Sequence, residues 1–234
     1  MIFAAILAGG NGTRMGNTEK PKQFLQLGSK PIIIHTIEKF YINNVFEKVI
    51  VLTPKEWINH TNNLIKKYIP DADNIVVIEG GTLRNDTIMS AINYIEENYD
   101  LSDDDIILTH DSVRPFVTYR IIEENIKAAK EYGACDTVIP ATDTIVESRN
   151  NGFVSNIPRR DILYQGQTPQ SFKILKLKEL YNKLTDSEKE ILTDACKIFL
   201  LKNEKISLVK GDLTNMKITY AYDLRIANAI LKES

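Results

Sequence analysis

The stretch that decides the fold is Ile2-Phe3-Ala4-Ala5-Ile6-Leu7, followed by Ala8-Gly9-Gly10-Asn11-Gly12-Thr13-Arg14. The continuous apolar run at 2–7 predicts a strand that is buried on both faces. A buried strand that ends in glycines brings backbone N–H groups to the edge of a sheet, and glycine lets a phosphate approach the main chain closely. Two cations, Arg14 and Lys22, follow within reach of the loop. We therefore expect a polyphosphate site here.

Two better-known glycine loops do not fit this stretch. A P-loop ends in Gly-Lys-Ser/Thr, which is missing, and Met15 stands where a dinucleotide-binding fingerprint counted from Gly10 needs its last glycine. For the glycines alone, a tight strand-to-helix turn with incidental charges remains an open alternative. The added Arg14 and the segment Lys20-Pro21-Lys22-Gln23-Phe24 favour phosphate binding.

A second glycine turn follows another predicted strand, at 74–78. Gly80 and Gly81 precede a helix predicted over about 84–98. In open parallel sheets, ligands bind outside the carboxyl ends of the strands, so the two turns are expected to face one ligand. The second turn would hold base, ribose or phosphate; a plain turn with a helix cap is the alternative.

Charged residues end a further buried strand, predicted at 105–109. Asp111 and Arg114 follow it directly. Asp111 would support Mg²⁺, directly or through water, because hard cations prefer carboxylate oxygens, or it would hydrogen-bond the hydroxyls of an acceptor. An Asp111–Arg114 pair that ties the loop is the third interpretation.

Strands and helices alternate along most of the chain, which predicts an α/β, doubly wound, three-layer sandwich with a mostly parallel sheet. Further strands are expected at 48–52, 135–140 and 207–210, and helices at 31–40, 55–68, 119–132, 174–183, 187–201 and from 222 onward. No repeat or linker interrupts the chain, so residues 1–234 are predicted to form a single domain.

The pattern changes between residues 141 and 172. The Asn151-Gly152 step between two β-like runs, 143–148 and 152–157, is a hairpin signal. We expect a projecting β-hairpin arm over 141–172 that pairs with a second subunit. Arg159 and Arg160 follow the hairpin, and a solvated basic corner is their simplest interpretation.

Composition limits the partners. The net charge of −2 gives no support for binding to nucleic acid or a membrane surface, so local cations must hold a polyanion. Cys135 and Cys196 lack metal-ligand spacing and are expected to be buried free thiols, which suits a reducing cytoplasm. Neither a signal peptide nor a membrane span is evident.

The motifs together resemble the 2-C-methyl-D-erythritol 4-phosphate cytidylyltransferases and their relatives acting on D-ribitol 5-phosphate. The resemblance implies a Rossmann-like, GT-A-like nucleotidyltransferase fold, CTP as co-substrate, Mg²⁺ between phosphates, and a homodimer with shared active sites. The matching stretches are 7–15, 21–23, 80–81, 84–87, 110–111, 114–115, 168–170, 193–194 and 217–219.

Individual roles also follow from the resemblance. It implies that catalysis rests on Arg14, Lys22, Arg160 and Lys217, with the first two stabilising the transition state and the last two positioning the acceptor phosphate. It implies acceptor contacts from Asp111, Arg114 and Thr193. The stretches that resemble CTP contacts are Leu7, Ala8, Gly9, Gly10, Gly81, Thr82, Leu83, Arg84, Asn85, Asp86, Thr87 and Ser112.

Within the family, the chain most resembles the ribitol-phosphate branch, at 112–116, 164–167 and 194–197. The erythritol enzymes often carry acidic residues where Ala195 and Thr214 stand. The resemblance thus implies CMP transfer from CTP to D-ribitol 5-phosphate, giving CDP-ribitol and pyrophosphate for teichoic acid or capsule synthesis. 2-C-methyl-D-erythritol 4-phosphate is the alternative acceptor.

Two other classes of protein fit the pattern less well. A GT-A glycosyltransferase would place an Asp-x-Asp motif after a strand, whereas 71–73 and 103–105 precede strands. A nucleotide sensor would not need Arg14, Lys22, Arg160 and Lys217 together. Pyrophosphate release from CTP separates the enzyme from both.

Overall fold

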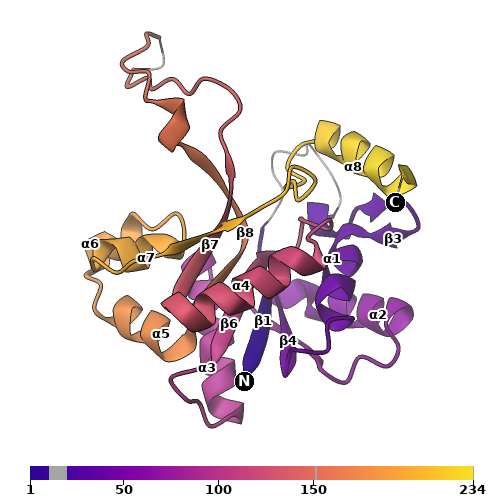
Figure 1. The fold of residues 1–234 in the computed structure, drawn as a ribbon. Helices are drawn as coiled ribbons and strands as arrows, with labels where there is room; N and C mark the ends of the chain where they lie inside the picture. Colours follow the sequence, from indigo (N-terminus) through magenta and orange to yellow (C-terminus); the bar gives the residue numbers. More distant parts are fainter. Residues whose placement is uncertain (11–19, 151, 234) are drawn as a thin grey trace.

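A seven-stranded sheet forms the centre of the molecule, with the strand order β5-β4-β1-β6-β8-β7-β9 (Figure 1). The computed structural model describes residues 1–10, 20–150 and 152–233. Only β8 runs against the others: it pairs antiparallel with β6 and β7, whereas the remaining pairs are parallel. The strands are β1 (Ile2–Leu7), β4 (Lys48–Thr53), β5 (Ile75–Glu79), β6 (Ile106–Asp111), β7 (Ala134–Pro140), β8 (Tyr164–Lys173) and β9 (Ser207–Lys210).

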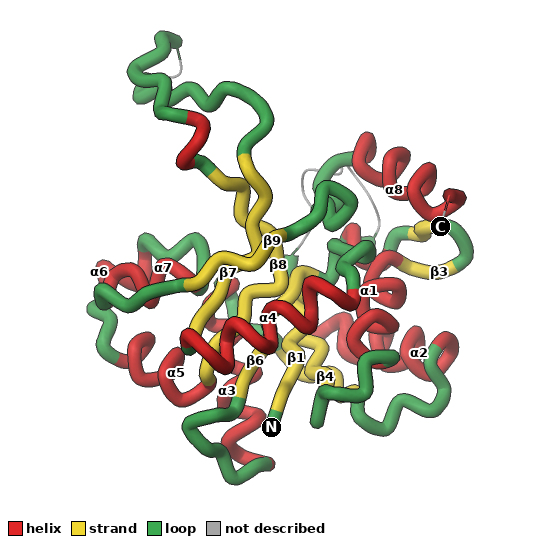
Figure 2. Tube along the Cα trace, in the orientation of Figure 1, coloured by secondary structure: helices red, strands yellow, loops and turns green. Residues whose placement is uncertain are grey.

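Helices cover both faces of the sheet, as the red segments of Figure 2 show. The side chains of β1 alternate between two apolar clusters: Ala4 and Ile6 pack on one face, Phe3 and Ala5 on the other. The first face is covered by α1 (Ile32–Tyr41), α2 (Ile58–Tyr68) and α4 (Tyr119–Tyr132), the second by α3 (Arg84–Asn98), α5 (Ile174–Asn182) and α7 (Cys196–Leu201). The predicted three-layer α/β sandwich with a mostly parallel sheet is confirmed.

A third, smaller cluster lies beside the sheet, where α8 (Ala221–Glu233) packs on β2 (Gln26–Leu27). Leu27, Ile32 and Ala227 are its buried members. Gly28 makes the turn between β2 and β3 (Lys30–Pro31) with a φ of 59°, and its N–H donates to Asn228 Oδ1 at 3.1 Å. The short helices are η2 (Lys22–Phe24), η3 (Lys55–Trp57), η4 (Arg160–Ile162) and α6 (Asp186–Glu190).

The expected arm is shorter than predicted at its C-terminal end. The prediction includes residues 164–172, but these belong to β8, between β6 and β7 in the sheet. The segment from about 141 to 163 projects away from the body (Figure 1). Its two expected strands are irregular in the described part, where a single bridge joins Glu147 to Asn156.

The helix expected over 187–201 is in fact two helices, α6 and α7, with a turn between them. Both cysteines are buried and free, as predicted. Within residues 1–10, 20–150 and 152–233, no helix is both long and apolar enough to cross a membrane.

Candidate active site

A cleft of about 390 Å³ opens where β1 and β6 end. Parallel strands leave their carboxyl ends at one edge of the sheet, and this is where ligands bind in such folds. The cleft is lined by Leu7, Gly9, Gly10, Lys22, Gln23, Gly81, Thr82, Leu83, Arg84, Thr87, Asp111, Ser112, Val113, Lys217 and Thr219.

The first loop and η2 form one side of the cleft. The Ala8 N–H continues the sheet by donating to Leu52 O at 2.7 Å. Gln23 Nε2 donates to Ala8 O at 2.7 Å, which ties η2 to the end of β1. Lys22 is thereby held at the cleft, with only 7% of its surface exposed. Arg14, the other cation predicted here, lies outside the described residues.

The second glycine turn lies opposite and leads into α3. A Cβ on Gly81 would come within 2.4 Å of the Asp86 side chain and 2.7 Å of its backbone, so only glycine fits. Thr87 Oγ1 donates to Leu83 O at 2.9 Å, and Asp86 Oδ2 accepts from the Leu83 N–H at 3.1 Å. The turn thus presents Gly81–Arg84 and Thr87 to the cleft, whereas Asp86 serves the helix cap and Asn85 is buried.

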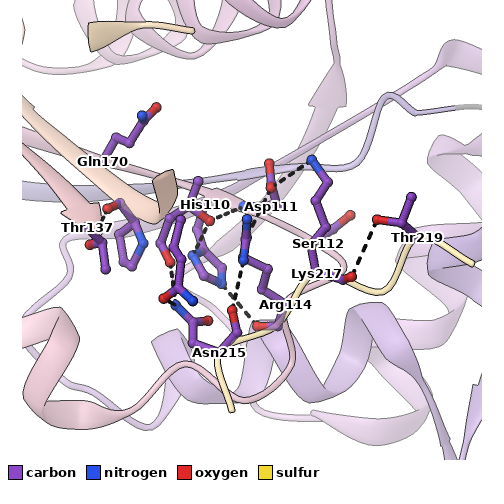
Figure 3. A network of polar contacts seen from close by, with 12 residues as sticks. His110, Asp111, Ser112, Arg114, Thr137, Gln170, Asn215, Lys217 and Thr219 are labelled. Atoms are coloured by element: carbon purple, nitrogen blue, oxygen red, sulfur yellow. Dashed lines mark hydrogen bonds and ion pairs between the residues drawn. The ribbon is translucent and has the colours of Figure 1, made fainter. Parts of the chain in front are cut away.

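Asp111 is the centre of the site's charges. Its Oδ1 accepts from Arg84 Nη1 at 2.5 Å, and its Oδ2 lies 3.3 Å from Arg114 Nε and 3.0 Å from Lys217 Nζ (Figure 3). Burial would raise the pKa of this carboxyl, but the three cations outweigh burial and hold its pKa well below the usual range. The residues come from β6, α3 and the loop after β9.

Direct magnesium ligation, one of the roles considered for Asp111, does not fit this arrangement. Both carboxylate oxygens already pair with cations, which would repel a divalent ion. Among the described residues, no group of three or more His, Cys, Asp or Glu side chains could hold a metal. The loop-tying Asp111–Arg114 pair is present instead, and we derive no step through a metal.

His110 supports Asp111 from behind the cleft, a role that the sequence did not predict. Its Nε2 donates to Arg114 O at 3.1 Å, so its Nδ1 accepts from Thr168 Oγ1 at 2.9 Å. The same Thr168 hydroxyl accepts the Asp111 N–H at 3.1 Å. Burial lowers the pKa of His110 to about 4, so the ring is neutral at neutral pH. A neutral ring with both nitrogens occupied is a support for the loop.

A second polar group, also not predicted, lies near Arg84. Gln170 Nε2 donates to Asp136 Oδ1 at 2.9 Å and to Asp194 Oδ2 at 2.8 Å. Burial raises the pKa of Asp136 to about 6, and the nearby Asp194 adds to this effect, whereas the Gln170 hydrogen bond opposes it. The negative charge of Asp194 also acts on Arg84. Polar residues within otherwise strand-like segments were the available signal for this group.

Two predicted site residues lie away from the cleft. Arg160 is exposed in η4, on the projecting arm, and donates to Thr142 O at 3.0 Å. Thr193 lies in the turn between α6 and α7 and does not line the cleft. Arg114 is buried beneath the cleft, where its Nη1 donates to Asn215 O at 2.8 Å. Within one chain, therefore, Lys22 and Lys217 meet at the cleft and Arg160 does not line it.

Residues 2–233 match the family of 2-C-methyl-D-erythritol 4-phosphate cytidylyltransferase, IspD. The chain belongs to the IspD family. It is a CTP-using nucleotidyltransferase of the cytidylyltransferase class. The cleft between two glycine turns and the cations at its edge are therefore those of an IspD-family enzyme.

Solved structures agree with this assignment. The chain is similar to 4-diphosphocytidyl-2C-methyl-D-erythritol synthase from Anaerococcus prevotii DSM 20548, with 26% identity, a TM-score of 0.80, and coverage of 99% of this chain and 96% of the other. It is also similar to the Francisella tularensis cytidylyltransferase (27%, 0.81, 97% and 98%) and to that of Thermus thermophilus (25%, 0.74, 99% and 100%).

Proposed function

We propose that the protein transfers CMP from CTP to a polyol phosphate. A phosphate oxygen of the acceptor attacks the α-phosphorus of CTP, the bond to the β-phosphate oxygen breaks, and pyrophosphate leaves with the bonding electrons. The observation that carries the proposal is the cleft itself, in which glycine backbone at two strand ends faces Lys22, Arg84 and Lys217. Backbone donors and fixed cations suit a triphosphate that gains charge at its leaving group.

This chemistry requires no general base. The acceptor phosphate is already an anionic nucleophile near neutral pH, so the enzyme has to align the reactants and neutralise charge. The buried His110 fits this view, because its two nitrogens are occupied and its pKa of about 4 keeps it neutral. Lys22 would stabilise charge on the phosphates of CTP, and Lys217, beside Asp111, would orient the acceptor phosphate.

We propose D-ribitol 5-phosphate as the acceptor, which makes CDP-ribitol for teichoic acid or capsule synthesis the product. Support comes from the ribitol-branch residues at 112–116, of which Ser112 and Val113 line the cleft. The other two positions act less directly. Ala195 is fully buried in the apolar cluster with α7, and Thr214 is exposed and bonds to Asp212.

2-C-methyl-D-erythritol 4-phosphate is the second candidate, because the family model and the similar structures carry that acceptor in their names. The two acceptors differ in chain length and in one methyl group, so the cleft must choose between a hydroxyl and an apolar group. A buried polar group left unpaired by the wrong substrate is the usual source of such a preference.

The deciding experiment is a coupled pyrophosphate assay with CTP and each acceptor under identical conditions. We expect a higher kcat/KM with D-ribitol 5-phosphate. A higher kcat/KM with 2-C-methyl-D-erythritol 4-phosphate would make the second candidate the function. Absence of pyrophosphate with either acceptor would reject the polyol-phosphate proposal. ATP, GTP and UTP serve as nucleotide controls.

We propose further that the enzyme works in the cytoplasm as a homodimer in which the arm completes the partner's site. The described arm leaves several apolar side chains exposed, among them Phe153, Val154 and Ile157. Such a surface suits pairing with another chain, since monomers rarely leave contiguous apolar area uncovered. Arg160, which lies on the arm, would then enter the partner's cleft.

A further inference from the structure

The loop between β9 and α8 carries two cleft residues, Lys217 and Thr219, without a helix or strand to hold it. A lysine on an unsupported loop would sample many positions, and each ångström of displacement weakens its catalytic use. Something must therefore fix the loop. The contacts that do so begin at Gln167 on β8, at the base of the arm.

Gln167 holds the start of the loop from both sides of one residue. Its Nε2 donates to Asp212 O at 2.8 Å, and its Oε1 accepts from the Asp212 N–H at 3.3 Å. The fit is close, because a Cβ on Gly211 would come within 2.4 Å of Gln167 Oε1. Gln167 is 6% exposed, so water does not compete well for these groups.

Asn215 fixes the middle of the loop. Its Nδ2 donates to Gln167 Oε1 at 3.1 Å and to Thr168 O at 2.8 Å, and the side chain is fully buried. Its own carbonyl accepts from Arg114 Nη1 at 2.8 Å (Figure 3). The loop is thus anchored to β8 and, through Arg114, to the segment after β6.

Lys217 sits between two fixed points of this loop. Asn215 is held on one side, and on the other the Ile218 N–H donates to Val113 O at 2.9 Å. Arg114, which holds Asn215 O, also contacts Asp111 Oδ2, the oxygen that lies 3.0 Å from Lys217 Nζ. Backbone and side chain of Lys217 are therefore placed by one connected set of hydrogen bonds.

We propose that Gln167 and Asn215 are positioning residues that set the place of Lys217 in the cleft. This inference rests on the proposed function, in which Lys217 orients the acceptor phosphate. The two amides touch neither reactant: they act through the loop. Because Gln167 lies three residues after the arm enters β8 at Tyr164, the same contacts connect the arm to the acceptor side of the cleft.

The kinetic test uses Gln167→Met, which keeps the shape of the side chain and removes its hydrogen bonds, and Asn215→Ala. We expect kcat/KM for the acceptor to fall about 10- to 100-fold, with the KM for CTP changed less than about twofold. In a Lys217→Ala background, either change should cause almost no additional loss, because residues that act through one group are not additive. Full additivity would overturn the proposal.

Asn125→Ala is the matched control. Asn125 is also a fully buried amide, but it joins α4 to β7 by donating to Ile121 O and Thr137 Oγ1. We expect it to lower the melting temperature without changing kcat or either KM, assayed well below that temperature. If Asn125→Ala and Asn215→Ala show the same kinetics at matched stability, Asn215 has only a structural role.

A second readout does not depend on catalysis. Labelling of lysines with an N-hydroxysuccinimide ester, followed by peptide mass spectrometry, reports the access of Lys217 relative to the exposed Lys66. Release of the loop should raise the Lys217 rate several-fold in Gln167→Met and Asn215→Ala, and not in Asn125→Ala. An unchanged rate would overturn the positioning role even if the enzyme used another substrate, whereas absence of CMP transfer by the wild type with a raised labelling rate would reject the proposed function alone.

Discussion

Asp111 Oδ2 lies 3.0 Å from Lys217 Nζ, and the same carboxylate also holds Arg84 and Arg114. One buried anion thus keeps three cations together at the edge of the cleft. Without it, the two arginines and the lysine would repel one another in a partly dry site. The charge arrangement that the proposed transfer uses therefore depends on a residue that is not required to react.

We expect Asp111→Asn to lower the free energy of unfolding by about 3 kcal/mol, because the cations it pairs lose their partner. The pKa of Asp111 is held below its usual range, so its stabilisation is complete above about pH 5 and is lost only as pH falls through the lowered pKa. The difference between variant and wild type should therefore stay constant from pH 5 to 8 in urea unfolding.

Asp104→Asn provides the surface comparison. Asp104 lies 2.9 Å from Lys173 Nζ and is 89% exposed, so removing its charge should alter stability by less than about 1 kcal/mol. If both variants lost the same free energy, the Asp111 cluster would carry no special weight.

Lys22→Ala and Lys217→Ala should reduce turnover about 10²- to 10³-fold, the usual result of removing one electrostatic contact to a transition state. We expect the same of Arg14→Ala, although Arg14 lies outside the described residues. Lys66→Ala, on the exposed side of α2, is the control that should leave turnover unchanged. Initial rates of pyrophosphate release at saturating CTP measure the effect, and a near-normal rate would remove that residue from the catalytic set.

Asp136→Asn should stabilise the protein at pH 8 by about 2 kcal/mol, less than the full linkage because the side chain is partly exposed. Burial and Asp194 raise the pKa of Asp136 to about 6, so its charged form is unfavourable in the folded state above that pH. As pH falls from about 6 to about 4, the wild type protonates and the advantage disappears. Thermal unfolding at pH 8, 6 and 4 tests this.

His110 changes wild-type stability in the opposite sense over that range. Its pKa of about 4 means that the unfolded chain binds more protons below about pH 6.5, so stability falls as pH decreases. This contribution is common to wild type and Asp136→Asn and cancels in their difference. A difference that did not vary with pH would contradict the assigned pKa of Asp136.

The first strand and the position of the cleft could be predicted because they depend on local pattern. The apolar run at 2–7 and the glycines that follow it specify a buried strand with open backbone at its end. β8 could not be predicted in this way. It carries Gly166 and Pro169 inside the strand, and proline ordinarily argues against a central strand. Its pairing with β7 is irregular at this place, where the register shifts between Asp136 and Val138.

Long-range contacts account for the remaining differences. Helix periodicity continues across residues 187–201, but Asp194 accepts the Cys196 N–H and its side chain binds Gln170, which starts a new helix at Cys196. The roles of Gln167 and Asn215 also depend on segments 48 positions apart in the chain. Sequence spacing contains no information on such pairs, because the fold alone brings them together.

The arm leads to the last prediction, which concerns shared sites. Arg160 is exposed on the arm and does not line its own chain's cleft, whereas Lys22 does. If Arg160 completes the partner's site, Lys22→Ala and Arg160→Ala are each nearly inactive alone. A mixed dimer then has one site that lacks both cations and one that is intact. Co-refolding equal amounts should restore activity to at most about a quarter of wild type, since half of the dimers are mixed and each has one working site. A purified mixed dimer as inactive as its parents would show that Arg160 acts within its own chain, and the shared-site arrangement would be wrong.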